Sequence, residues 1–229
     1  MMLLLILASV LLLSPPLQPA AVARQMHAVP LDVHKFKVLG EEYDPENPHQ
    51  QAPTYYHTVD DGQQSFVRGI YLPPQSTVTL FQDVPDELHQ GVRRMQWRWR
   101  AQVLPRHGNE CASGLGDSAA AVYITWKRGL RWYSLKFIWS ADAPVGATCN
   151  RIRNPFVASD SIVLRSGPAT NGWEEEVVDP EELFRQHFDR DVPELQGIGL
   201  MTDGDQTGSM SAADYAGFVL YKRFSTASR

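Results

Sequence analysis

The stretch RMQWRWRAQV, residues 94–103, alternates without a break between apolar and polar side chains. Successive side chains of a β-strand point to opposite faces, so this alternation predicts a strand with one buried face and one solvated face. The buried face would carry Met95, Trp97, Trp99, Ala101 and Val103, and the solvated face Arg94, Gln96, Arg98, Arg100 and Gln102.

Similar short runs, separated by turn signals, fill the chain from Phe66 onward. Residues 119–126 and 130–140 predict two strands joined by Lys127-Arg128-Gly129, a short hairpin connection that contains glycine. Further strands are predicted over residues 161–165, 197–202 and 215–221.

The sequence predicts one helix, which begins after residue 179. Asp179 is an N-cap residue, Pro180 suits the first helical position, and Glu182 completes a capping pattern. Phe184 and Phe188, four residues apart, would share the face that docks on a sheet. Many short strands with one short helix predict an all-β fold, an antiparallel β-sandwich of jelly-roll type.

The composition excludes several classes of protein. The 229 residues are 43% hydrophobic and 21% charged, with a formal net charge of −5. These values are ordinary for a globular domain and exclude a disordered or collagen-like chain. Without a basic footprint, we expect no nucleic acid partner.

The first residues predict export. Residues 3–13, LLLILASVLLL, are too short an apolar run for a membrane span but suit a signal peptide, and Ala21-Val22-Ala23 suits its cleavage. We expect a signal peptide over residues 1–23, an irregular N-terminal arm over residues 24–64 with one strand at residues 34–39, and a β-sandwich domain over residues 65–229. No later segment is long and apolar enough to span a membrane, so we expect a soluble protein in the periplasm or outside the cell.

The two cysteines, Cys111 and Cys149, predict one disulfide, because an exported chain folds in an oxidising compartment. The alternative is a cysteine nucleophile with His107 as its base, which depends on spatial geometry that spacing does not show.

Several short motifs follow a recognisable order along the chain: LKFIWS at 135–140, NPF at 154–156, SIVLRSG at 161–167, GW at 172–173, ELFRQHF at 182–188 and MTDGDQTG at 201–208. Together they resemble the bacterial domain-of-unknown-function family 3047 over residues 66–222. The resemblance implies an exported bacterial β-sandwich protein and no established activity. Where that family has paired aspartates and an arginine before a Val-Tyr strand, this chain has Asp117-Ser118 and no arginine.

The loop Asp203-Gly204-Asp205-Gln206-Thr207-Gly208 is a candidate cation site. Two carboxylates two residues apart, with glycines that permit tight curvature, can present oxygens to a hard cation such as calcium. Asp214 could add a ligand if the loop folds back. The alternative is a simple turn, in which Asp and Gly satisfy the backbone.

The same carboxylates are candidates for glycoside cleavage, which needs two carboxyl groups on either side of the scissile bond. Asp203 and Asp205 would act with Asp179 or with a glutamate of the run Glu174-Glu175-Glu176. A run of this kind is more often a solvated face.

Three tryptophans are candidates for ligand binding. Trp126 and Trp132 flank the hairpin turn, and Trp173 follows the turn signal Asn171-Gly172. Exposed aromatic rings on a sandwich can stack on sugar rings, although large aromatic residues are mostly core anchors. Arg94, Arg98 and Arg100 form a basic stripe, which we expect to pair with acidic residues of a neighbouring strand.

We therefore expect a non-catalytic binding module for carbohydrate or cell-envelope glycan. The alternatives are a carboxylate-dependent glycoside-cleaving enzyme and a structural or partner-binding envelope protein.

Overall fold

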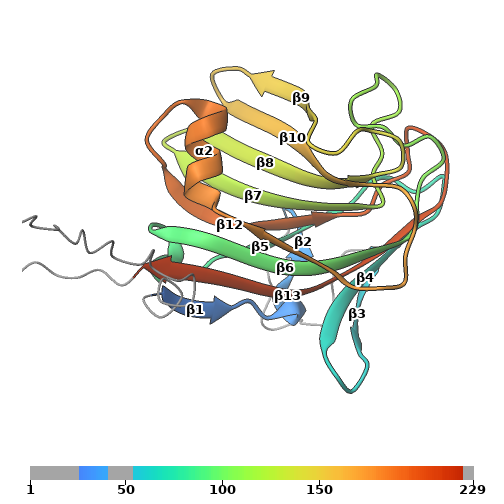
Figure 1. Cartoon of the computed structure of the whole chain (residues 1–229), viewed down its shortest axis with the longest axis horizontal. Helices are drawn as coiled ribbons and strands as arrows, with labels where there is room; N and C mark the ends of the chain where they lie inside the picture. The colour runs from blue at the N-terminus through green and yellow to red at the C-terminus, as the bar shows by residue number, and fades with distance from the viewer. Residues whose placement is uncertain (1–25, 41–53, 224–229) are drawn as a thin grey trace, which may run out of the picture.

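The alternating stretch lies in the middle of a two-sheet sandwich, in strand β6 (Val92–Val103). The computed structural model of the chain describes residues 26–40 and 54–223, and Figure 1 shows the two sheets stacked with one helix at an end. Trp97 and Trp99 of β6 are fully buried between the sheets, which confirms the predicted inner face.

The first sheet, sheet A, has strand order β11-β6-β13-β4-β3, and β1 also pairs with β13. All its pairs are antiparallel. Its other strands are β11 (Glu174–Val178), β13 (Ser211–Arg223), β4 (Ser65–Tyr71), β3 (Tyr56–Asp60) and β1 (Met26–Pro30).

The second sheet, sheet B, has strand order β2-β5-β12-β7-β8-β10-β9. One pair, β8 with β10, is parallel, because β9 takes the edge position between them in sequence. The strands are β2 (Lys37–Val38), β5 (Thr79–Asp83), β12 (Glu194–Met201), β7 (Ala120–Arg128), β8 (Arg131–Ser140), β10 (Val157–Ser166) and β9 (Thr148–Arg153). The predicted jelly-roll β-sandwich is therefore confirmed, with a mixed rather than purely antiparallel second sheet.

Aromatic rings join the two layers. The ring of Trp97 lies 5.5 Å from that of Phe137 on β8, and the ring of Trp99 lies 5.9 Å from that of Trp139. Because each buried ring removes a large apolar area from water, these contacts dominate the packing of β6 on β8.

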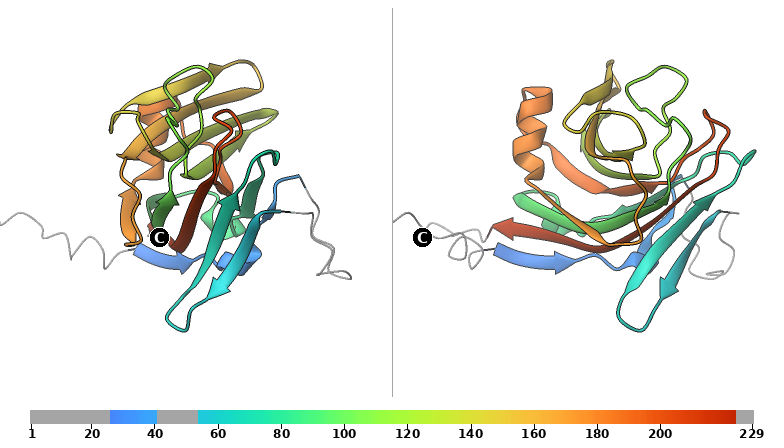
Figure 2. Two further views of the ribbon diagram at one scale, coloured as in Figure 1. Left: turned by 90° about the vertical axis from the view of Figure 1, so that its right-hand side faces the viewer. Right: turned by 45° about the vertical axis from the view of Figure 1, so that its right-hand side comes forward.

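The helix α2 (Pro180–Phe188) closes one end of the sandwich, as the views of Figure 2 show. The Asp179 side chain accepts a hydrogen bond from the Glu182 amide, which confirms the predicted N-cap. Phe184 is fully buried, with its ring 5.2 Å from those of Trp126 and Tyr133.

The expectation of an irregular N-terminal arm is wrong for its described residues. The segment before residue 65 supplies β1, β2 and β3, and 3-10 turns lie at Val33–Lys35 and at Asp86–Leu88. An edge strand is held by backbone hydrogen bonds on one side only, so it needs no strict apolar alternation. The predicted signal peptide lies outside the described residues. Within the described ranges no helix is long and apolar enough to cross a membrane.

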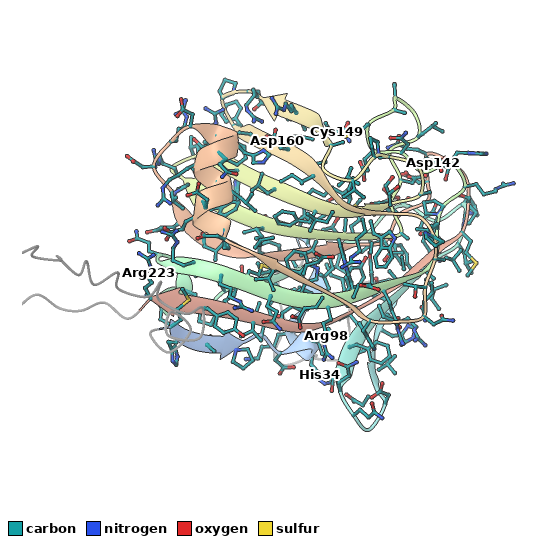
Figure 3. The ribbon with its side chains drawn as sticks, viewed as in Figure 1. His34, Arg98, Asp142, Cys149, Asp160 and Arg223 are labelled. Carbon is teal, nitrogen blue, oxygen red and sulfur yellow. A yellow bond between two sulfur atoms is a disulfide. The ribbon has the colours of Figure 1, made fainter. Side chains whose placement is uncertain are left out.

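Cys111 and Cys149 form the predicted disulfide, with Cα atoms 5.0 Å apart. It ties the loop between β6 and β7 to β9, and Figure 3 labels Cys149 at the upper edge of sheet B. The disulfide excludes a free cysteine nucleophile in this structure.

We predict that the double variant Cys111→Ala/Cys149→Ala has a lower free energy of unfolding, by up to about 4 kcal/mol, because the bridge restrains the unfolded chain. Urea denaturation measures the difference, and a dithiol reductant should destabilise the wild-type chain but not the variant. Equal stability of the two proteins would contradict the prediction.

Candidate functional site

A hollow of about 380 Å³ lies on the face of sheet B that points away from sheet A. Alternation in the strands builds it, because side chains that flank buried core residues point outward. Tyr123 and Thr125 flank the buried Ile124 of β7, and Trp132 and Ser134 flank the buried Tyr133 of β8. The rest of the lining is Leu39, Thr79, Phe81 and Gly199.

Two glycines of β12 make room for the hollow. Gly199 pairs with Phe81 on one side and with Tyr123 on the other, and it has no side chain to fill the space between them. A Cβ atom on Gly197 would lie 2.2 Å from the Phe81 ring, so that ring lies directly over the glycine backbone. Because Gly199 has no side chain, β12 leaves open the space between Phe81 and Tyr123. Gly197 lets the Phe81 ring lie close to the strand backbone.

The lining combines aromatic surface with hydroxyl groups that are available to a ligand. Among the described residues, the hydroxyls of Thr79, Thr125 and Ser134 have no hydrogen-bond partner. Tyr123 donates its hydroxyl to the sulfur of Met201 at 3.3 Å, a weak acceptor. Small-molecule sites are typically apolar hollows with a few polar groups of this kind.

The three candidate tryptophans lie in three different environments. Trp132 is 39% exposed at the hollow, with the Lys127 ammonium 4.6 Å from its ring centre. Trp173 lies on the sheet A side, against the Arg100 guanidinium at 4.5 Å and edge-on to Phe66. Trp126 is 1% exposed, so its predicted exposure is wrong: it packs in the core against the helix.

One end of the sheet B face holds a buried ion pair. Glu110, in the loop next to Cys111, contacts the Lys136 ammonium and accepts hydrogen bonds from Ser118 and from Asn150, next to Cys149. Burial alone would lower the pKa of Lys136, but the neighbouring Tyr123 and Glu110 outweigh it and raise that pKa. The lysine therefore stays charged beside the hollow.

Three carboxylates converge elsewhere, at the loop that follows β12. One oxygen from each of Asp117, Asp203 and Asp205 lies within 4.8 Å of the other two. Asp117 accepts hydrogen bonds from the Gln206 and Thr207 amides, which brings two loops distant in sequence together. These are the described residues that could hold a calcium ion, a ligand set of oxygens that calcium prefers.

Asp214 does not belong to this group, so its predicted role as a third ligand is wrong. Its side chain, on the sheet A strand β13, is fully buried between two arginines of the neighbouring strands, 2.7 Å from Arg68 and 2.7 Å from Arg100. The strand β13 carries Asp214 to a register position opposite both arginines, away from the loop. The pairing of the basic stripe with an acidic neighbour is thereby confirmed for Arg100.

Asp203 is buried beside two other carboxylates. Burial, together with the charges of Asp117 and Asp205, raises its pKa, although the Thr77 hydroxyl donates to it at 2.6 Å and opposes the shift. From the described residues, the Asp203 side chain accepts hydrogen bonds on one oxygen, Oδ1, donated by the Thr77 hydroxyl and by the Gly204 and Asp205 amides.

The remaining candidate carboxylates do not meet Asp203 and Asp205. Glu174 and Glu176 of β11 both pair with Arg165, and Glu175 accepts a hydrogen bond from Gln96. Asp179 caps the helix and pairs with Arg93 at 2.8 Å. Among the described residues that line the hollow, none carries a carboxylate.

The fold and the hollow define a class: a β-sandwich protein with an aromatic, hydroxyl-bearing hollow on one sheet face. The chain belongs to the family described as protein of unknown function DUF3047, which matches residues 42–219 and confirms the resemblance seen in the motifs. A comparison with curated proteins finds no match.

Among solved structures, the chain is similar to a family 11 carbohydrate-binding module from Clostridium thermocellum in complex with a β-1,3-1,4-mixed-linked tetrasaccharide. The identity is 9% and the TM-score 0.42, over 84% of this chain and 94% of that chain. It is also similar to the endoglucanase cel12A from Rhodothermus marinus, at 10% identity and a TM-score of 0.45, over 87% and 97% of the two chains. A third is the xyloglucanase domain of NopAA from Sinorhizobium fredii, at 9% identity and a TM-score of 0.42, over 86% and 96%.

We predict that Asp203→Asn removes a pH-dependent loss of stability. A raised pKa means that the folded protein favours the protonated Asp203 carboxyl over the ionised one. This preference stabilises the fold fully below the carboxyl's pKa in the unfolded chain, about 3.9, and the stabilisation is lost as the pH rises through the pKa in the folded chain. The asparagine keeps an Oδ1 acceptor and cannot ionise. In urea titrations with a chelator present, the stability of the variant relative to wild type should therefore increase from pH 3 upward.

The exposed Asp83, changed to asparagine, is the control for the loss of one negative charge. A relative stability of Asp203→Asn that stays constant or falls over this range would contradict the raised pKa.

The calcium site stays a prediction, now with Asp117 in place of Asp214. Millimolar calcium should raise the melting temperature of the wild-type chain, because an ion that binds only the folded state stabilises it. Asp203→Asn should lose most of that increase. An unchanged melting temperature in calcium would reject the site and leave the loop as a turn.

Proposed function

We propose that the protein is an exported, soluble binding module for carbohydrate or cell-envelope glycan, and that the hollow on sheet B is its binding site. The single observation that supports this most is the half-exposed Trp132 ring beside hydroxyls that have no protein partner. The apolar face of a sugar ring suits the aromatic wall, and its hydroxyls suit Thr125 and Ser134.

The volume and the chemistry of the hollow agree with a ligand of this size. Small-molecule sites range over roughly 300–1,000 Å³, and the hollow lies near the lower end. Such a ligand would cover β5, β12, β7 and β8, which all contribute to the lining.

The lining residues that the structure describes are aromatic, aliphatic or hydroxyl-bearing, which suits binding better than cleavage. Hydrolysis of a glycosidic bond needs an acid and a second carboxylate on either side of the bond. The nearest charged pair that borders Tyr123 is Glu110 with Lys136, and it is buried and neutralised. The role of a structural envelope protein remains the alternative if no glycan binds.

Export rests on the signal-peptide pattern of residues 1–23 and fits the disulfide. Disulfides persist in oxidising compartments, and this one holds the loop that carries Glu110 against β9.

We predict that Trp132→Ala weakens binding of a glycan ligand at least tenfold, equivalent to about 1.4 kcal/mol. A glycan array identifies the ligand, and titration calorimetry measures both proteins. Trp173→Ala is the matched control, because it removes a partly exposed tryptophan from the other sheet, and it should bind like wild type. Release of shorter sugars during the titration would instead favour the enzyme.

The proposal fails if no glycan binds the folded chain. It also fails if the Trp173 variant loses binding while the Trp132 variant keeps it. Because Trp132 is exposed, its replacement should leave the circular dichroism spectrum and the melting temperature nearly unchanged.

A further inference from the structure

The charge that faces Trp132 indicates which glycans the hollow would select. Lys127 and Trp132 are opposite each other in the pairing of β7 with β8, so their side chains share the outer face of sheet B. The Lys127 ammonium lies 4.6 Å from the centre of the indole ring. A cation at this distance is attracted to the ring face.

Lys127 has no acidic partner in the part of the chain that the structure describes. Within residues 26–40 and 54–223, no carboxylate lies within 4 Å of its ammonium, although Glu194 occupies the neighbouring position on β12. The other two lysines of this face are neutralised: Lys37 pairs with Asp83 at 3.4 Å, and Lys136 pairs with Glu110. Of the lysines on the described part of this face, Lys127 is thus the one without an ion pair, in a chain whose net charge is −5.

This arrangement treats neutral and acidic sugars differently. A sugar that stacks on this face of Trp132 must displace the ammonium, which then loses its favourable contact with the ring. A neutral sugar forms no ionic interaction with the displaced lysine. A sugar with a carboxylate accepts a charge-assisted hydrogen bond from it, which is roughly twice as strong as a hydrogen bond between neutral groups.

The neighbouring row of side chains fits the rest of such a ring. Thr125 and Ser134 are paired with each other, two residues further along β7 and β8 than Lys127 and Trp132. Two residues of strand span about 7 Å, so a carboxylate at Lys127 leaves the ring hydroxyls within reach of these two side chains.

We propose that the ligand of the hollow is an acidic glycan, whose sugar carboxylate binds Lys127 while the ring stacks on Trp132. This inference rests on the proposed glycan-binding function and adds the class of glycan. Lys127 is then the residue that determines specificity, and Trp132 supplies affinity for acidic and neutral sugars alike.

The test uses a panel of oligouronates (galacturonate, glucuronate, mannuronate and guluronate) and the same oligosaccharides with their carboxyl groups reduced to alcohols. Each reduced sugar keeps the ring and carries a neutral hydroxymethyl group in place of the carboxylate. At least one acidic member should bind ten times more tightly than its reduced form. Lys127→Gln should cut that ratio to about twofold or less, because it weakens binding of the acidic sugar and modestly strengthens binding of the reduced sugar, which no longer displaces an ammonium from the ring.

Lys37→Gln is the matched control, since it removes an already paired lysine from the same sheet face and should keep the preference. The selectivity should also decrease between 0.05 and 0.5 M salt, roughly as expected for an exposed charge pair.

Two results overturn the inference and separate it from the proposed function. If reduced sugars bind as well as acidic ones, or if Lys127→Gln keeps the preference, while Trp132→Ala abolishes binding, the hollow is a glycan site without selection for acid. If neither member of any pair binds, and a neutral glycan array is also negative, both proposals are wrong.

Discussion

The packing of aromatic rings between the two sheets is the constraint on which the rest of the structure depends. Trp97 and Trp99 pack edge to face with each other, and their rings contact Phe137 and Trp139 of the opposite sheet. Since β8 presents Phe137 inward, alternation turns Lys136, Ser134 and Trp132 outward. The register of the core thereby places every residue that β8 contributes to the hollow.

Buried charged side chains that are paired with side chains of opposite charge also contribute to the structure. Asp214 lies between two guanidinium groups, and Glu110 lies against Lys136 beside the disulfide. Removing one partner from such a group leaves an uncompensated charge, which costs far more than the pair contributes. These groups therefore fix the outer faces of both sheets, while the hollow keeps its hydroxyls free.

Local sequence patterns predicted much of the fold. The alternation over residues 94–103 gave β6, and Asp179 with Pro180 gave the start of the helix. The error at Trp126 has a clear reason: Val122, Ile124 and Trp126 alternate inward, and that pattern outweighs the closeness of a turn. Two glycines on one face of β12 were the available signal for a hollow.

The rest depended on contacts that spacing does not show. Asp117 meets Asp203 only because two loops close over the end of the sheet, and the parallel pairing of β8 with β10 depends on where β9 lies. The Lys127 ammonium on the Trp132 ring follows from a hairpin register, which the predicted turn placed approximately but did not specify.

The most direct test of the sheet B site is a titration of isotope-labelled protein with an acidic oligosaccharide, followed by nuclear magnetic resonance. The account predicts that the indole N–H of Trp132 and the amides of Thr125 and Ser134 shift together and saturate, while the indole N–H of Trp173 does not move. Shifts that gather around Trp173 and Arg98 on sheet A, with Trp132 unchanged, would contradict it.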